Sequence, residues 1–143
     1  MLRACVGFVF VLVVLAAGGA SPAFEPLPAF PGAEGFGRFA TGGRGGDVYH
    51  VTTLDDDGPG GLRQAIKTKR PDVPRTVVFD VGGTIRLRKE LRLEDVRGLT
   101  LAGQTAPGDG ITLRDHGIRF YRCSDIVVRY LRFRLGDETN TSE

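Results

Sequence analysis

The sequence predicts an all-β fold, and within that class a β-solenoid, in which each turn of the chain adds two or three short parallel strands. In the second half of the chain, short β-branched runs recur between glycines and Asp-Gly turns. One set begins at Val77, Leu99 and Ile126, 22 and 27 residues apart, and a second begins at Ile85 and Ile111, 26 apart. Such a period is typical of solenoids.

Two other architectures fit the sequence less well. A βαβ fold would need helices of about 10–15 residues between the strands, and no such segment separates these runs. An antiparallel sandwich would favour two-residue hairpins such as Asn-Gly, and the sequence contains none.

The first 23 residues are predicted to be a signal peptide. Arg3 gives a positive start, residues 6–17 are uninterruptedly apolar, and cleavage after Ala20 or Ala23 would satisfy the preference for small residues. The apolar run is shorter than the roughly 20 residues of a membrane-spanning helix, although a retained N-terminal anchor is the alternative. We therefore expect a secreted protein, extracellular or periplasmic, with no membrane attachment after cleavage.

Residues 24–74 are expected to form an N-terminal loop and cap region. A proline-rich lead-in and a glycine-dense loop at 32–46 precede a strand at 47–53. The glycines lack the Gly-Lys-Ser/Thr ending of a phosphate-binding loop, so we interpret them as tight loop packing.

A short amphipathic helix is predicted at 62–69. Leu62, Ala65 and Ile66 have the spacing of one helical face, and Pro71 ends the helix. Because the first turn of a solenoid exposes unpaired backbone groups and a core cross-section, we expect this helix to cover it.

Residues 75–143 are expected to form about three turns of the solenoid, incomplete at the C-terminus. After Phe133 no capping segment follows, and residues 135–143 are polar and loop-like. We therefore expect a chain that is truncated within the solenoid.

The charge and cysteine content argue against a nucleic-acid-binding domain and against a domain stabilised by disulfides. The 19 basic and 17 acidic residues nearly balance, whereas a nucleic-acid-binding domain is usually strongly basic. Only Cys123 would remain after signal cleavage, so no intramolecular disulfide can form. We expect Cys123 to be a small buried apolar residue.

Four segments carry a resemblance to a known family: AFPGAEGFGRFATGGRGGDVYHVTTLDDDGPGGLRQAI, RTVVFDVGGTIRL, LTLAGQTAPGDGITL and IVVRYLRFRLGDE. From about Ala29 to Glu138 they resemble, in order, the N-terminal third of secreted pectate lyases of the right-handed parallel β-helix type. The resemblance implies that fold, calcium as cofactor, and β-elimination cleavage of polygalacturonate by a protein that is monomeric at full length. It implies no nucleic-acid partner.

The resemblance assigns few site residues. In the family, acids from neighbouring turns bind calcium and an arginine of a later turn is the base, and no residue here matches that arginine. Asp137, in the segment RLGDE, is the one candidate calcium ligand, with a solvated loop acid as the alternative. The catalytic and substrate-binding residues are left unassigned, and this chain by itself is expected to lack the catalytic centre.

Other motifs have structural interpretations. The run Asp55-Asp56-Asp57-Gly58 does not fit a calcium-binding EF-hand, because Thr53 and Gln64 would occupy positions that need acids. We interpret it as a helix start with acids favoured by the helix dipole.

Basic residues alternate with apolar ones along several strands. Such alternation gives a strand one charged and one core-facing side, and the residues are Arg86, Arg88, Arg129, Arg132 and Arg134. The charged side would attract a polyanion such as pectate, or would simply be solvated. His50 and His116 are isolated in the sequence, and Asn140 begins a glycosylation sequon.

Three alternatives to a lyase stay open. A non-catalytic β-solenoid could bind cell-wall polysaccharide. An inverting β-helix glycoside hydrolase would need two carboxyl groups about 6.5–9.5 Å apart. An inactive truncated product would expose an open apolar edge and be poorly soluble.

Overall fold

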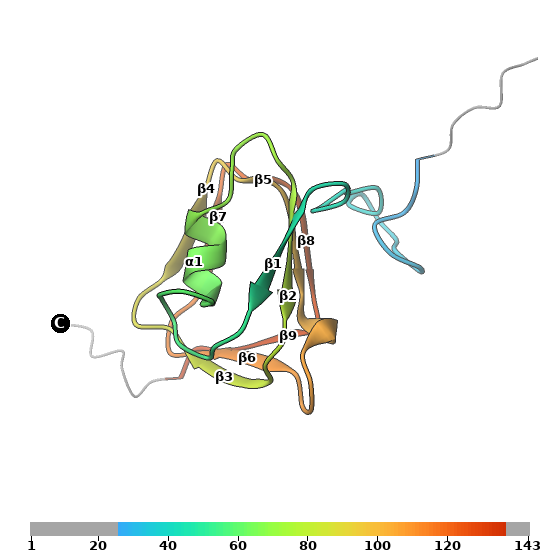
Figure 1. The fold of residues 1–143 in the computed structure, drawn as a ribbon. Coiled ribbons are helices and arrows are strands. Elements are labelled where there is room, and N and C mark those ends of the chain that lie inside the picture. Colours follow the sequence, from blue (N-terminus) through green and yellow to red (C-terminus); the bar gives the residue numbers. More distant parts are fainter. Residues whose placement is uncertain (1–25, 137–143) are drawn as a thin grey trace, which may run out of the picture.

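The computed structural model describes residues 26–136, and the predicted signal peptide, Asp137 and the glycosylation sequon lie outside them. Figure 1 looks along a coil whose three parallel sheets form the sides of a triangle. Sheet A contains β1 (Asp47–Val51), β2 (Arg75–Phe79), β5 (Arg97–Ala102) and β8 (Ser124–Arg129); sheet B contains β3 (Gly83–Arg86), β6 (Ile111–Arg114) and β9 (Leu131–Arg134); sheet C contains β4 (Leu91–Glu94) and β7 (Ile118–Tyr121).

The chain winds through the sheets in a fixed order. Strands β2, β3 and β4 form one turn, β5, β6 and β7 form the next, and β8 and β9 continue into a third. Every neighbouring pair is parallel, and parallel crossover connections are right-handed in nearly all proteins. The predicted right-handed parallel β-helix with about three turns and a short capping helix is confirmed.

The register corrects the predicted repeat at two points. Leu99 lies opposite Ile126, as its spacing of 27 predicted. Val77 lies opposite Leu101 rather than Leu99, and Ile85 lies opposite Leu113 rather than Ile111. Backbone hydrogen bonding sets the register, so the first residues of two apolar runs need not pair with one another. The sequence interpretation also missed β4, a short strand in which arginine and glutamate alternate with two leucines.

The apolar run from Ile126 to Phe133 is two strands rather than one. Tyr130 separates β8 from β9 and has a φ of 55°, in the left-handed region that residues with a Cβ seldom occupy. This single residue turns the chain from sheet A to sheet B. Asp95 and Arg122 have the same conformation, with φ of 52° and 51°, at successive corners between sheets C and A.

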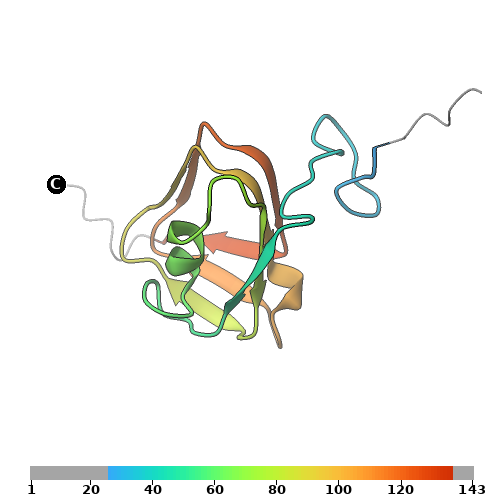
Figure 2. The ribbon, with the colours of Figure 1, turned by 45° about the horizontal axis from the view of Figure 1, so that its top comes forward.

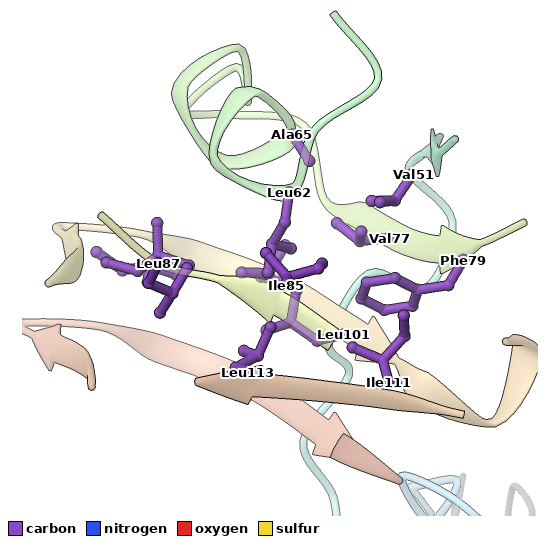
Figure 3. Packing of buried hydrophobic residues seen from close by; sticks show 13 residues of the cluster. Val51, Leu62, Ala65, Val77, Phe79, Ile85, Leu87, Leu101, Ile111 and Leu113 are labelled. Atoms are coloured by element: carbon purple, nitrogen blue, oxygen red, sulfur yellow. The ribbon is translucent and has the colours of Figure 1, made fainter. Parts of the chain in front are cut away.

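The interior is filled by alternate residues of each strand. Leu99, Leu101, Ile111 and Leu113 are fully or almost fully buried, and their neighbours along each strand point outward. Figure 3 shows side chains of successive turns stacked against one another. Cys123 was expected to be buried; it packs against this core but is only partly buried.

The helix α1 (Leu62–Lys67) covers the first turn, as predicted. Leu62 and Ala65 are completely buried and point into the core from above Val77 and Ile85 (Figure 3). Ile66 packs at its margin. The apolar face of α1 therefore replaces the turn that would otherwise precede β2.

The N-terminal loop leaves the coil beside sheet A, as Figure 2 shows. Its glycines allow close packing where they touch the sheet: a Cβ on Gly43 would lie 2.2 Å from the Arg75 carbonyl oxygen. Within residues 26–136, no helix is long and apolar enough to cross a bilayer.

Candidate functional site

The outer face of sheet B carries a dense group of arginines. Its outward positions are occupied only by threonine and arginine: Thr84 and Arg86 on β3, Thr112 and Arg114 on β6, Arg132 and Arg134 on β9. We call these six residues the arginine face. The strand register aligns Arg86, Arg114 and Arg134 in one column, and Thr84, Thr112 and Arg132 in the other.

A buried acid anchors this face. Asp115 follows β6 with a φ of 80°, and only 4% of its surface is exposed. Its carboxylate lies 3.2 Å from Nε of Arg114 and 3.9 Å from a terminal nitrogen of Arg86. Arg132 donates from Nε to the Thr112 hydroxyl at 3.0 Å and from its terminal nitrogen to the Asp109 carbonyl oxygen. The arginines are thus partly positioned by the protein itself.

The outer face of sheet C has a different charge pattern. Arg92 pairs with Glu94 at 2.8 Å, and Arg119 pairs with Glu90 at 3.0 Å. The Arg92 guanidinium also lies over the Tyr121 ring at 5.8 Å. Each arginine of this face has an acidic neighbour, so its charges are balanced locally.

A buried ion pair ties the cap to the first turn. Both oxygens of Asp56 accept hydrogen bonds from Arg63 of α1, at 2.9 and 3.0 Å, and one also accepts the Arg88 backbone N–H. Arg63 donates further to the carbonyl oxygens of Lys89 and Glu90. Asp56 and Arg63 are 4% and 5% exposed. Asp56 therefore pairs with a buried arginine, which the interpretation as a helix-dipole acid missed.

A second pair fixes the start of sheet A. Asp47 accepts hydrogen bonds from Arg75 at 2.8 and 2.7 Å, and Arg75 also donates to the Ala65 carbonyl oxygen and the Thr68 hydroxyl at the end of α1. The hydrogen bonds from Arg75 lower the pKa of the Asp47 carboxyl below its ordinary range, and those to Asp47 raise the pKa of Arg75.

The structure places His50 but does not describe Asp137, the predicted calcium ligand. Asp137 lies outside the described residues, so its role as a calcium ligand stays a prediction. Among residues 26–136, no three His, Cys, Asp or Glu side chains lie close enough to hold a metal ion. His50 is not isolated: its Nδ1 lies 3.0 Å from both oxygens of Asp80, and both side chains are about half exposed.

The alternating arginines named from the sequence are divided between different faces. Arg86, Arg132 and Arg134 do share one outer face, but Arg129 lies on sheet A, over the Phe30 ring at 4.0 Å. Arg114, which the sequence interpretation omitted, stands in the middle of the face. It follows Leu113 in the same alternation of apolar and basic residues as Arg86 after Ile85, so the pattern was present in the sequence.

Parallel strands wound in successive turns around a leucine-rich core, capped by one short helix, define the chain as a parallel β-helix protein. Sequence comparison with two relatives identifies the family within this class. The chain is 54% identical over 110 residues to probable pectate lyase C of Emericella nidulans, which covers 77% of this chain and 25% of the relative. It is 48% identical over 126 residues to probable pectate lyase C of Aspergillus fumigatus, which covers 88% of this chain and 28% of the relative.

The resemblance to the pectate lyase family predicted from the sequence is therefore confirmed, for a chain that spans about a quarter of the length of these relatives. No family model matches the chain. It is also similar to the crystal structure of jun a 1, the major allergen from cedar pollen, with 26% sequence identity and a TM-score of 0.49 over 69% of this chain and 28% of that one.

Proposed function

We propose that this chain forms the N-terminal part of a secreted, calcium-dependent pectate lyase, which cleaves polygalacturonate by β-elimination. The observation that carries the proposal is the 54% identity, over 110 residues, to a relative named as a pectate lyase. The capped parallel β-helix supports it, because this coil can hold side chains of successive turns in line. In this proposal the chain supplies the cap and the first turns of the scaffold.

The proposed reaction needs groups beyond those of the described residues. A base takes the proton from C5 of a uronate, the C4–O bond to the next sugar breaks, and a double bond forms between C4 and C5. Calcium would neutralise the uronate carboxylate beside C5. Residues 26–136 do not themselves provide a cluster of acids for that ion. We propose Asp137 as one ligand, and place the other ligands and the base in turns beyond this chain.

The proposal includes the organisation and location of the protein. Residues 1–23 are assigned as a cleaved signal peptide, 24–74 as the loop and cap region, and 75–143 as the first turns of the coil. The uninterrupted apolar segment at 6–17, followed by small residues, supports export. The full-length protein is expected to be a monomer whose partner is an acidic polysaccharide.

A chimera tests whether this chain is a lyase scaffold. The segment of this chain that matches the Emericella nidulans relative replaces the corresponding 110 residues of that protein. Unsaturated product released from polygalacturonate is measured with calcium and with a chelator. We expect the chimera to release product only with calcium, and the 143-residue chain alone to release none. A matched chimera carrying Asp56→Ala should be less stable, because the cap pair is lost.

Two results would contradict the proposal. If the parent relative is active and the chimera folds with the same circular dichroism spectrum but releases no product, the scaffold is not that of a lyase. If the chain of 143 residues alone releases unsaturated product, its placement as a scaffold without the catalytic centre is wrong.

A further inference from the structure

We infer that the arginine face of sheet B is a binding surface for a linear polyuronate chain that runs parallel to the coil axis. The inference rests on the proposed function for the class of its ligand, and it adds a surface to which no role has been assigned. The face is slightly hollowed, with Thr84, Arg86, Thr112, Arg114 and Arg134 along it and Phe133 to Gly136 at one end.

The first argument is spacing. Arg86, Arg114 and Arg134 occupy matching positions of three neighbouring strands, and neighbouring strands of a sheet lie about 4.8 Å apart. A polyuronate carries one carboxylate on every ring, and a six-membered ring with its bridging oxygen has a length of that order. The spacing of the guanidinium groups is therefore of the same order as the repeat of a polyuronate chain that runs along the axis.

The second argument is charge. Four guanidinium groups share this face, and Asp115 contacts two of them, those of Arg86 and Arg114. Like charges on directly opposite strand positions repel one another and destabilise the sheet. An anionic chain on the face would remove this repulsion. Sheet C offers no comparable surface, because Arg92 and Arg119 each have a glutamate partner.

The third argument is chemical composition. Guanidinium groups donate paired hydrogen bonds to carboxylates, and threonine hydroxyls both donate to and accept from sugar hydroxyls. The outward positions of the three strands hold only threonine and arginine, and Phe133 lines the end of the hollow, whereas stacking of successive bases needs several aromatic rings along the surface. A sugar acid fits this combination better than a single-stranded nucleic acid does.

The test compares two charge-matched double variants of the full chain. The first carries Arg86→Gln and Arg134→Gln; Arg114 is left unchanged because it contacts buried Asp115. The control carries Arg97→Gln and Arg122→Gln, two exposed arginines on other faces, each paired with an aspartate. Binding is measured by affinity electrophoresis in polygalacturonate with a chelator present, at rising sodium chloride concentration. Circular dichroism checks that both variants are folded.

We expect the unmodified chain and the control to bind polygalacturonate equally, with an affinity that falls as salt rises. The sheet B variant should bind about tenfold more weakly, from the loss of two charge-assisted contacts. Fully methyl-esterified pectin, which has no free carboxylates, should not bind to any of them.

Three results would overturn the inference: no binding of polygalacturonate by the unmodified chain, equal loss in both variants, or tighter binding of single-stranded DNA than of polygalacturonate. Because the measurement needs neither calcium nor cleavage, its result does not depend on whether the lyase proposal is correct. An inactive chimera together with selective loss in the sheet B variant would contradict the lyase function and leave the binding surface standing.

Discussion

Replacement of Asp56 by alanine should lower the free energy of unfolding by about 3–5 kcal/mol. Asp56 accepts two hydrogen bonds from the buried Arg63 guanidinium and one from the Arg88 backbone N–H. Alanine leaves Arg63 buried beside a lost carboxylate, with only carbonyl oxygens as partners. Removing one member of a buried pair is strongly destabilising because the other charge is left uncompensated.

The size of this effect can be measured by urea and thermal unfolding followed by circular dichroism. A loss of 3–5 kcal/mol should lower the midpoint temperature by on the order of 10–20 °C. The matched control is Asp57→Ala, whose partner Lys67 is exposed, and it should leave the stability nearly unchanged.

A double-mutant cycle completes this test. Asp56→Ala with Arg63→Met removes both charges and should recover much of the loss seen for Asp56→Ala, because no buried charge is left unpaired. A loss of under about 1 kcal/mol for Asp56→Ala, or no coupling between the two positions, would refute the assignment of this pair as the anchor of the cap.

Two further predictions concern the same end of the coil. Gly43→Ala should destabilise the protein by about 3 kcal/mol in urea unfolding, because the new Cβ would meet the Arg75 carbonyl oxygen at 2.2 Å, whereas Gly37→Ala, which meets nothing within 4 Å, should be neutral; equal effects would contradict this packing. The Asp47 carboxyl has a pKa lowered by Arg75, so its stabilisation is complete above the ordinary pKa of 3.8 and is lost as pH falls through the lower native value. Asp47→Asn should therefore be less stable than the unmodified chain at pH 7, with the difference shrinking below about pH 4; a constant difference would contradict the shift.

The sequence alone was sufficient to predict those helices and strands whose residue pattern lies within a single segment. The spacing of Leu62, Ala65 and Ile66 predicted the cap helix, and the β-branched runs predicted strands that do form. Both patterns reflect one element that exposes one side to the core, so the residues of that element alone carry the information.

The candidate site depended on contacts between distant segments. Asp56 becomes a buried partner of Arg63, and Arg114 joins Arg86 and Arg134, only when successive turns are stacked. The sequence shows which residues of each strand alternate between core and surface. The lengths of the corners between strands decide which residues of neighbouring strands align.

There is a physical reason why some features could be predicted from the sequence and others were decided only by the tertiary structure. Burial on one side of a strand is a period-two property that a sequence displays directly. The left-handed corner at Tyr130, which divides one apolar run between sheets A and B, carries no comparable signal, because tyrosine seldom adopts that conformation. Only the packed turns make that corner favourable, and with it the position of the arginines on the outer face of sheet B.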